Sequence, residues 1–412
     1  MLAIRGKAIV LLAGTVVLGC DTAPRADLLT PVITQRDEGT LTPSAVSLWA
    51  AQVEDSTGPD AAYAMFVPTN WDESGRRLML FVHGYVDPDS AVTLPNIAAL
   101  RDAVGAKGFA VAYSSFSENG WAVKDGEQRS HQLRGLFASR FGEPARTYIY
   151  GRSMGGLIAV MMAEKYPEQY AGVFSECGVI GGAPIRFRYL FDVRQLFDYF
   201  YPDQLPGNVL GVPLHWRLGK ADADRIDLAM ATDMSGALAI AKIDQTPVQF
   251  QPGNMKELRA AIIDQLRRHA REVNDIMARG HGKPPIGSSV YTDTINADGT
   301  FLLDPGLLAS VNSSTVHFDA EPDAAKFAAH YYDPSGDLRI PVMTLTTKRD
   351  PALPSPLSEV LYQSRVDAAG SDMLLRRPAL DRYGHCAFLP AERANAFLDF
   401  VTWADTKAPA TP

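Results

Sequence analysis

The chain has 412 residues, of which 46% are hydrophobic and 21% are charged. This is ordinary usage for a large globular domain with room for an insertion, and it excludes a disordered chain, a collagen-like repeat and a polytopic membrane protein. The net charge of −8 gives no electrostatic reason to bind nucleic acid, and three cysteines are too few for a fold held together by disulfides.

The first 19 residues are expected to be a targeting signal rather than part of the fold. Arg5 and Lys7 precede the uncharged apolar run 8–18, which is too short to span a bilayer as a permanent helix. The run ends in Val-Leu-Gly-Cys20, which resembles the lipobox of bacterial lipoproteins. The resemblance implies a lipid anchor on Cys20 and a place at the bacterial cell envelope, on its periplasmic or extracellular face. An ordinary signal peptide followed by a chance cysteine is the alternative.

Residues 20–47 carry three prolines among scattered polar residues and are expected to form a tether. Residues 48–182 then alternate short apolar runs with helical spacing. The expected strands are 61–67, 78–82, 109–113, 147–150 and 171–174, and the expected helices are 96–107, 128–141 and 157–166. Because strands of this length alternate with helices, we predict a mostly parallel sheet covered by helices on both faces.

The alternation stops over residues 183–337, where helical patterns dominate, and returns over 338–405. The returning part is expected to hold strands at 340–345 and 373–376, and helices at 356–368 and 392–403. Residues 406–412 read as a tail. The predicted architecture is therefore an α/β core interrupted by a large, mainly helical insertion.

The motif Gly151-Arg152-Ser153-Met154-Gly155 lies where an expected strand runs into an expected helix. The pattern Gly-x-Ser-x-Gly is weak by itself, but this context is that of a nucleophile elbow, in which a serine sits exposed on a strained turn. A serine hydroxyl needs a base, an acid that orients the base, and donors for the developing oxyanion. Ser153 is the predicted nucleophile, and a turn with a merely structural serine is the alternative.

His385 is the predicted base, because it follows the last expected strand and precedes the last helix. Asp350 is the predicted acid, because it lies just past the returning strand and completes the chain order Ser…Asp…His. Two competitors for the acid are Glu176, at the end of the strand after the nucleophile helix, and Asp381, close to the histidine in sequence.

Two backbone N–H groups are expected to form the oxyanion hole. One belongs to Met154, at the start of the helix after the nucleophile, and the other to Tyr85, in the His83-Gly84-Tyr85 turn. His83 is then structural. Trp121, in a loop at the same edge of the sheet, is the candidate for contact with substrate.

The segments FVHGY, YIYGRSMGG, TTKRDPALP and YGHCAF resemble those of secreted bacterial α/β hydrolases. The resemblance covers residues 61–182 and 338–405 and implies an α/β-hydrolase fold, with the insertion as a lid. Glycine, histidine and cysteine in a row also resemble the tannase and feruloyl-esterase group, where that cysteine bonds a cysteine just before the serine. Residue 152 is arginine here, so Cys177 is the expected partner of Cys386, with two buried thiols as the alternative.

The predicted function is a serine hydrolase that cleaves small or polymeric carboxylic esters through an acyl-enzyme. The chemistry needs no cofactor, and the acidic clusters at 222–227 and 293–299 lack the spacing of an EF-hand, so no metal site is predicted. One alternative is a serine peptidase of the prolyl-oligopeptidase type. The other is a lipoprotein that binds a ligand on a hydrolase scaffold without turnover.

Overall fold

A computed structural model describes residues 48–58, 61–292, 303–353 and 355–407. The predicted signal peptide, Cys20 and the tether lie outside the described residues, as does most of the tail. Among the residues described, no helix combines the length and the apolar character needed to cross a membrane.

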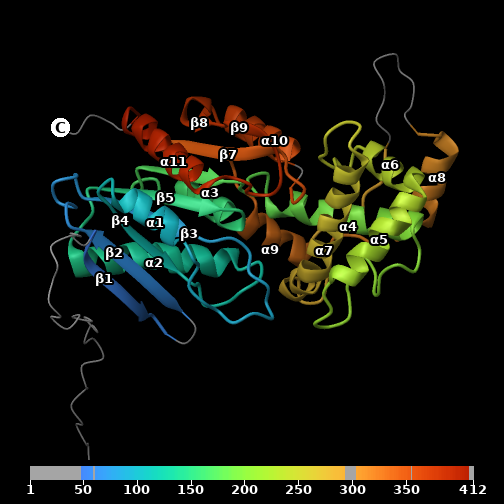
Figure 1. Cartoon of the computed structure of the whole chain (residues 1–412), viewed down its shortest axis with the longest axis horizontal. Helices are drawn as coiled ribbons and strands as arrows, with labels where there is room; N and C mark the ends of the chain where they lie inside the picture. The colour runs from blue at the N-terminus through green and yellow to red at the C-terminus, as the bar shows by residue number, and fades with distance from the viewer. Residues whose placement is uncertain (1–47, 59–60, 293–302, 354, 408–412) are drawn as a thin grey trace, which may run out of the picture. The chain divides into compact units, whose positions relative to one another are not determined.

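A single mixed sheet organises the described chain (Figure 1). Its strands are β1 (Trp49–Ser56), β2 (Ala62–Pro68), β3 (Arg77–Val82), β4 (Phe109–Ser114), β5 (Arg146–Arg152), β6 (Gly172–Glu176), β7 (Val342–Arg349), β8 (Leu375–Arg376) and β9 (Ala379–Tyr383). The order is β1-β2-β4-β3-β5-β6-β7-β8, and β9 also pairs with β7. The β1–β2 and β2–β4 pairs are antiparallel and the others are parallel. The parallel strands therefore end at one common edge.

Helices cover both faces of this sheet. They are α1 (Ala98–Gly105), α2 (Val123–Phe141), α3 (Met154–Lys165), α10 (Ser355–Ala368) and α11 (Pro390–Asp405). Side chains alternate along β3, so Leu78 and Leu80 join the core under α2 and α3, while Met79 and Phe81 join the core under α1 and α11. This two-sided burial explains why the strands are continuous apolar runs.

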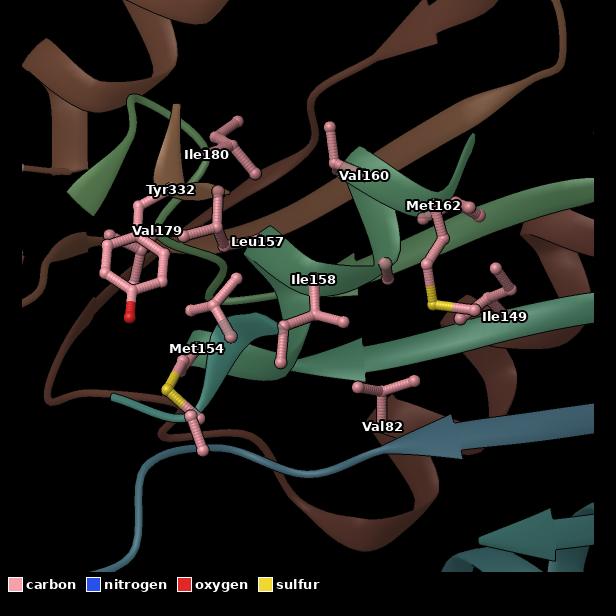
Figure 2. Close-up of a cluster of buried hydrophobic side chains, with 14 of the residues drawn as sticks. Val82, Ile149, Met154, Leu157, Ile158, Val160, Met162, Val179, Ile180 and Tyr332 are labelled. Carbon is pink, nitrogen blue, oxygen red and sulfur yellow. The ribbon is translucent and has the colours of Figure 1, made fainter. Parts of the chain in front are cut away.

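Helix α3 is apolar on nearly its whole circumference, because the sheet and neighbouring helices enclose it. Figure 2 shows Leu157, Ile158 and Met162 of α3 packed with Val82 of β3 and Ile149 of β5. This packing holds the start of α3 rigidly at the carboxyl ends of β3 and β5.

The insertion between β6 and β7 is helical and has a hydrophobic core of its own (Figure 1). Its helices are α4 (Ala183–Phe200), α5 (Lys220–Thr232), α6 (Met234–Lys242), α7 (Met255–Arg279), α8 (Pro305–Ser314) and α9 (Pro322–Tyr332). Phe187 and Phe191 of α4 and Val273 of α7 also belong to the core that lies between the sheet and helices α2 and α3. The insertion is therefore packed on the α/β core as well as on itself.

The predicted fold class, an α/β-hydrolase fold with a mainly helical insertion, is confirmed by this topology. The structure differs from the predicted elements where the sequence pattern is weak. Strand β1 was not predicted, because it is the outermost strand and its residues are only half-buried or exposed. The strand expected at 373–376 is shorter, because Asp372–Leu374 form a 3₁₀ turn before β8. Helix α2 begins five residues before the expected position, where Val123 turns into the core.

Candidate active site

Ser153 lies at the sharp turn between β5 and α3. Its backbone has φ 56° and ψ −121°, a strained combination for a residue with a side chain. The two glycines of the motif allow this turn. A Cβ atom on Gly151 would lie 2.1 Å from the carbonyl oxygen of Gly155, and one on Gly155 would lie 2.1 Å from that of Val82. The spacing Gly-x-Ser-x-Gly is therefore a steric requirement of this elbow.

The serine, the histidine and one aspartate form a hydrogen-bonded row. Ser153 Oγ lies 2.8 Å from Nε2 of His385, and Nδ1 of the same ring lies 2.8 Å from Oδ2 of Asp350. Asp350 is fully buried, and its other carboxylate oxygen accepts a hydrogen bond of 2.8 Å from the Ala352 N–H. The structure thus brings together three residues that are far apart in the chain, in the arrangement that the sequence analysis predicted.

The loop that carries His385 is held from two sides. The Thr347 hydroxyl donates to the Gly384 carbonyl at 2.7 Å, and the Gly384 N–H donates to the Arg349 carbonyl at 3.0 Å. On the other side, Cys386 forms a disulfide with Cys177, with the Cα atoms 5.3 Å apart. The predicted disulfide is confirmed, and it ties the histidine loop to the end of β6.

The turn before the expected oxyanion hole lies against the nucleophile. A Cβ atom on Gly84 would be 3.0 Å from Cβ of Ser153, so this glycine lets the turn approach. Met154 is the first residue of α3, and the N–H groups of a first turn have no partner within their helix. Tyr85 is fixed by its hydroxyl, which donates to the Arg271 carbonyl at 3.1 Å. Both amides lie at the edge of the sheet where the parallel strands end, next to Ser153. Their role as an oxyanion hole stays a prediction.

The competing residues have other partners. Glu176 is buried, accepts a hydrogen bond from the Tyr150 hydroxyl and forms ion pairs with Arg152 and Arg393. Asp381 is paired with Arg349.

His83 is buried and stacks on Phe116 with ring centroids 3.7 Å apart. Burial lowers its pKa, which favours the neutral ring. Its Nδ1 lies 2.7 Å from the Gly84 carbonyl, so the ring supports the turn beside the nucleophile.

Trp121 is 2% exposed and lies in the core between the α/β part and the insertion. Its indole packs edge-on against Phe187 at 4.9 Å, and Tyr85 lies 5.9 Å away on another side. Its backbone N–H donates to Asp275 of α7 at 2.7 Å. Trp121 therefore joins the insertion to the turn near Ser153, and its contact with substrate remains a prediction.

The sequence analysis did not predict two buried hydrogen bonds that connect the insertion to the loop after Asp350. The Gln265 side chain on α7 donates to the carbonyl of Pro351, the residue after Asp350. Its own amide oxygen accepts a hydrogen bond of 2.9 Å from Arg186 on α4, whose pKa burial lowers to about 10. The apolar spacing of α7 indicated a buried face but gave no means to name the partner of a glutamine on it.

Cys177, His385 and Cys386 are close enough together to suggest metal ligands. The two sulfur atoms form the disulfide, however, and so offer no thiolate to a metal ion. The histidine is engaged by Ser153 and Asp350.

The topology and the strained elbow at the carboxyl ends of the parallel strands are those of the α/β-hydrolase fold. A family model described as “Putative esterase” matches residues 82–188, a stretch that includes Ser153, Tyr85 and Met154. This stretch of the chain is thus similar to an esterase family. No curated protein matches it in sequence.

Several solved structures are similar in fold. The esterase Pf2001 of Pyrococcus furiosus is 11% identical with a TM-score of 0.42, covering 91% of this chain and 98% of that one. A membrane phospholipase A, described as a bacterial virulence factor, is 15% identical with a TM-score of 0.41, covering 86% and 87%. Est1E from Butyrivibrio proteoclasticus is 12% identical with a TM-score of 0.38, covering 85% and 99%. At identities this low, function must be argued from the chain's own residues.

Proposed function

We propose that the protein is a serine hydrolase that cleaves carboxylic esters through an acyl-enzyme intermediate. The observation that carries the proposal is the row Ser153–His385–Asp350, joined by two hydrogen bonds of 2.8 Å. The match of residues 82–188 to an esterase family model favours an ester over a peptide as the substrate.

The first half of the reaction forms the acyl-enzyme. His385 Nε2 takes the proton of Ser153 Oγ as that oxygen attacks the ester carbonyl carbon. The buried carboxylate of Asp350 accepts from Nδ1, which holds the ring in the correct tautomer and stabilises the imidazolium that forms. The imidazolium then returns its proton to the leaving alkoxide, and the alcohol departs.

The second half releases the acid. Water replaces the alcohol and gives a proton to His385 Nε2 as it attacks the acyl carbonyl carbon. The imidazolium then returns this proton to Ser153 Oγ as the bond between Oγ and the acyl carbon breaks, which frees the acid and the serine hydroxyl. In both halves the negative charge on the carbonyl oxygen is stabilised by the N–H groups of Met154 and Tyr85. The dipole of α3, which begins at Met154, adds to this stabilisation.

The test is labelling of the folded protein with a fluorophosphonate probe, beside a p-nitrophenyl ester series. We expect Ser153→Ala to abolish labelling and to lower kcat by about 10⁴-fold or more. Asp350→Asn should lower kcat strongly while leaving Ser153 in place. Ser139→Ala, an exposed serine on α2, is the matched control and should behave as wild type.

Labelling without ester turnover would redirect the assignment to a peptidase. A folded protein that takes no label would overturn the proposal and leave a ligand-binding protein on a hydrolase scaffold.

We also propose that the protein is exported and anchored by Cys20 at the cell envelope, with residues 183–337 acting as a lid over the site. The export proposal is supported by the residues before Cys20 and by the disulfide, since disulfides persist in oxidising compartments. The lid proposal is supported by Gln265 and Arg271 of α7, which contact the acid loop and the oxyanion turn.

A further inference from the structure

A cavity of about 260 Å³ lies on the face of the sheet covered by α1 and α11, and Arg152, the residue before Ser153, lines it. Phe81 lies among its lining residues, together with the first turn of α1, the start of α11 and the side chains of Arg152, Glu176 and Arg393. The proposed mechanism uses none of these side chains.

The cavity adjoins the catalytic residues through the chain itself. Arg152 precedes Ser153, and the Ser153 N–H donates to the Glu176 carbonyl at 2.9 Å. Arg393 donates through its guanidinium to the Cys386 carbonyl at 3.0 Å, and Cys386 follows His385. Two of the cavity's lining residues, Arg152 and Arg393, are thus joined to the segments of Ser153 and His385 by a peptide bond and by a hydrogen bond.

The charges of the cavity favour an anion. Glu176 is 1% exposed and pairs with Nε of Arg393 at 3.0 Å and Nε of Arg152 at 3.5 Å. Among the charged side chains that line the cavity, one buried carboxylate thus pairs with two guanidinium groups, which leaves one positive charge in excess. Arg152 remains 40% exposed, so solvent and solutes can reach its guanidinium group. Guanidinium groups bind carboxylates through paired hydrogen bonds.

The first turn of α1 adds to this field. Ile97 precedes the helix and supplies no side-chain cap, and the turn contains no acidic residue. The Asn96 side-chain oxygen accepts from the Ala98 N–H at 3.3 Å, and the positive dipole end of the helix borders the cavity without an acidic side chain in its first turn. At α11, by contrast, Glu392 already accepts from the Leu389 N–H.

We propose that this cavity is an anion subsite, and that the preferred substrates are esters carrying a carboxylate within reach of Arg152 and Arg393. The inference rests on the proposed function, because it names the class of ester that the same serine would cleave. The carboxylate can belong either to the acyl group or to the alcohol.

The test compares charged with neutral esters at fixed low ionic strength. One arm uses mono-p-nitrophenyl adipate against p-nitrophenyl hexanoate, which places the carboxylate on the acyl side. The other uses 4-acetoxybenzoate against phenyl acetate, which places it on the alcohol side. The readout is the change in the charged-to-neutral ratio of kcat/KM on mutation, because the intrinsic reactivities of the esters then cancel.

We expect Arg152→Gln and Arg393→Gln each to lower this ratio about tenfold in one arm. Arg152→Lys, which keeps the charge but loses the fork, should retain part of the preference. Arg339→Gln is the control, because Arg339 is 59% exposed and precedes β7 at the opposite edge of the sheet. A ratio unchanged in both arms, or an equal fall for charged and neutral esters, would overturn the inference while the proposed function stands.

Binding is measured separately, so that the subsite can be judged even if no ester is turned over. Adipate dianion, followed by titration calorimetry, should bind the wild type and Arg339→Gln and should bind Arg152→Gln and Arg393→Gln at least about tenfold more weakly. Failure of the wild type to bind adipate would also count against the subsite. Binding without turnover of any ester would uphold the subsite and reject the proposed function.

Discussion

Ser153 shows how single residues define the site. Its φ of 56° costs about 1–3 kcal/mol in an ordinary setting. The turn is held by hydrogen bonds on both sides, from its own N–H to the Glu176 carbonyl at 2.9 Å and from the Gly156 N–H to its carbonyl at 2.8 Å. Gly151 and Gly155 remove the clashes. These needs are local, so the sequence motif was sufficient to predict the elbow.

Asp192 is a buried residue of α4 whose protonation should affect stability. Burial raises its pKa to about 7, although the hydroxyls of Ser289 and Tyr291 lie 2.8 and 3.2 Å from its carboxylate oxygens. The folded state thus binds a proton that the unfolded chain has already lost above about pH 4. Stability therefore falls as pH rises from about 4 to about 7, by at most about 4 kcal/mol from this group.

Asp192→Asn should remove this contribution, so its stability relative to wild type should improve with rising pH and level off above about pH 7. Thermal unfolding of both proteins between pH 4 and pH 8 measures the difference. Glu359, whose pKa burial also raises to about 7, affects both proteins equally. The exposed Asp337→Asn is the control. Parallel pH profiles for wild type and Asp192→Asn would contradict the prediction.

At the scale of elements, α7 is the helix that connects the insertion to the site. Its buried face meets α4 and the core of the insertion, while Gln265 reaches the loop after β7 and the Arg271 carbonyl receives the Tyr85 hydroxyl. One helix therefore contacts both the loop that follows Asp350 and the turn that contains Tyr85. Its amphipathic spacing predicted its existence, but the partners of its polar residues depend on how the insertion folds back.

The disulfide links two more elements, the end of β6 and the loop before α11. Cys177 and Cys386 are separated by 209 residues in the chain. In the chain-entropy account, closing so long a loop restricts the unfolded state strongly, and loss of the bond should cost about 2–5 kcal/mol. We expect Cys177→Ala/Cys386→Ala to lower Tm, and to lower kcat because the His385 loop loses its covalent link to the end of β6.

Differential scanning calorimetry with and without dithiothreitol checks this expectation. Reductant should lower the Tm of wild type toward that of the double variant and should leave the double variant unchanged. Equal Tm values for wild type and the double variant would show that the disulfide does not stabilise the folded protein, which would contradict the prediction.

At the scale of the whole molecule, anchoring remains to be tested. Export with a lipid on Cys20 would tether the catalytic domain through residues 20–47. We predict that the full chain made in a bacterium incorporates labelled palmitate and sediments with membranes. Cys20→Ser should lose the label and move to the soluble fraction. Ser139→Ala, an exposed change that leaves all three cysteines in place, is the control. Equal labelling of wild type and Cys20→Ser would contradict a lipid on this residue.

The sequence by itself determined the alternation of strands and helices, the place of the insertion and the elbow at Ser153, because these depend on local periodicity and on short-range sterics. It also ranked Asp350 above Glu176 and Asp381, because Asp350 lies just past the returning strand and completes the chain order Ser…Asp…His.

Only the tertiary structure decided which polar groups meet across long separations. The pairing of Gln265 with the Pro351 carbonyl, the burial of Trp121 against Phe187 and the cavity bordered by Arg152 and Arg393 each join distant segments. Such contacts are set by how the insertion and the final helix pack on the sheet. That packing depends on the shapes of whole surfaces, which no local pattern in the chain contains.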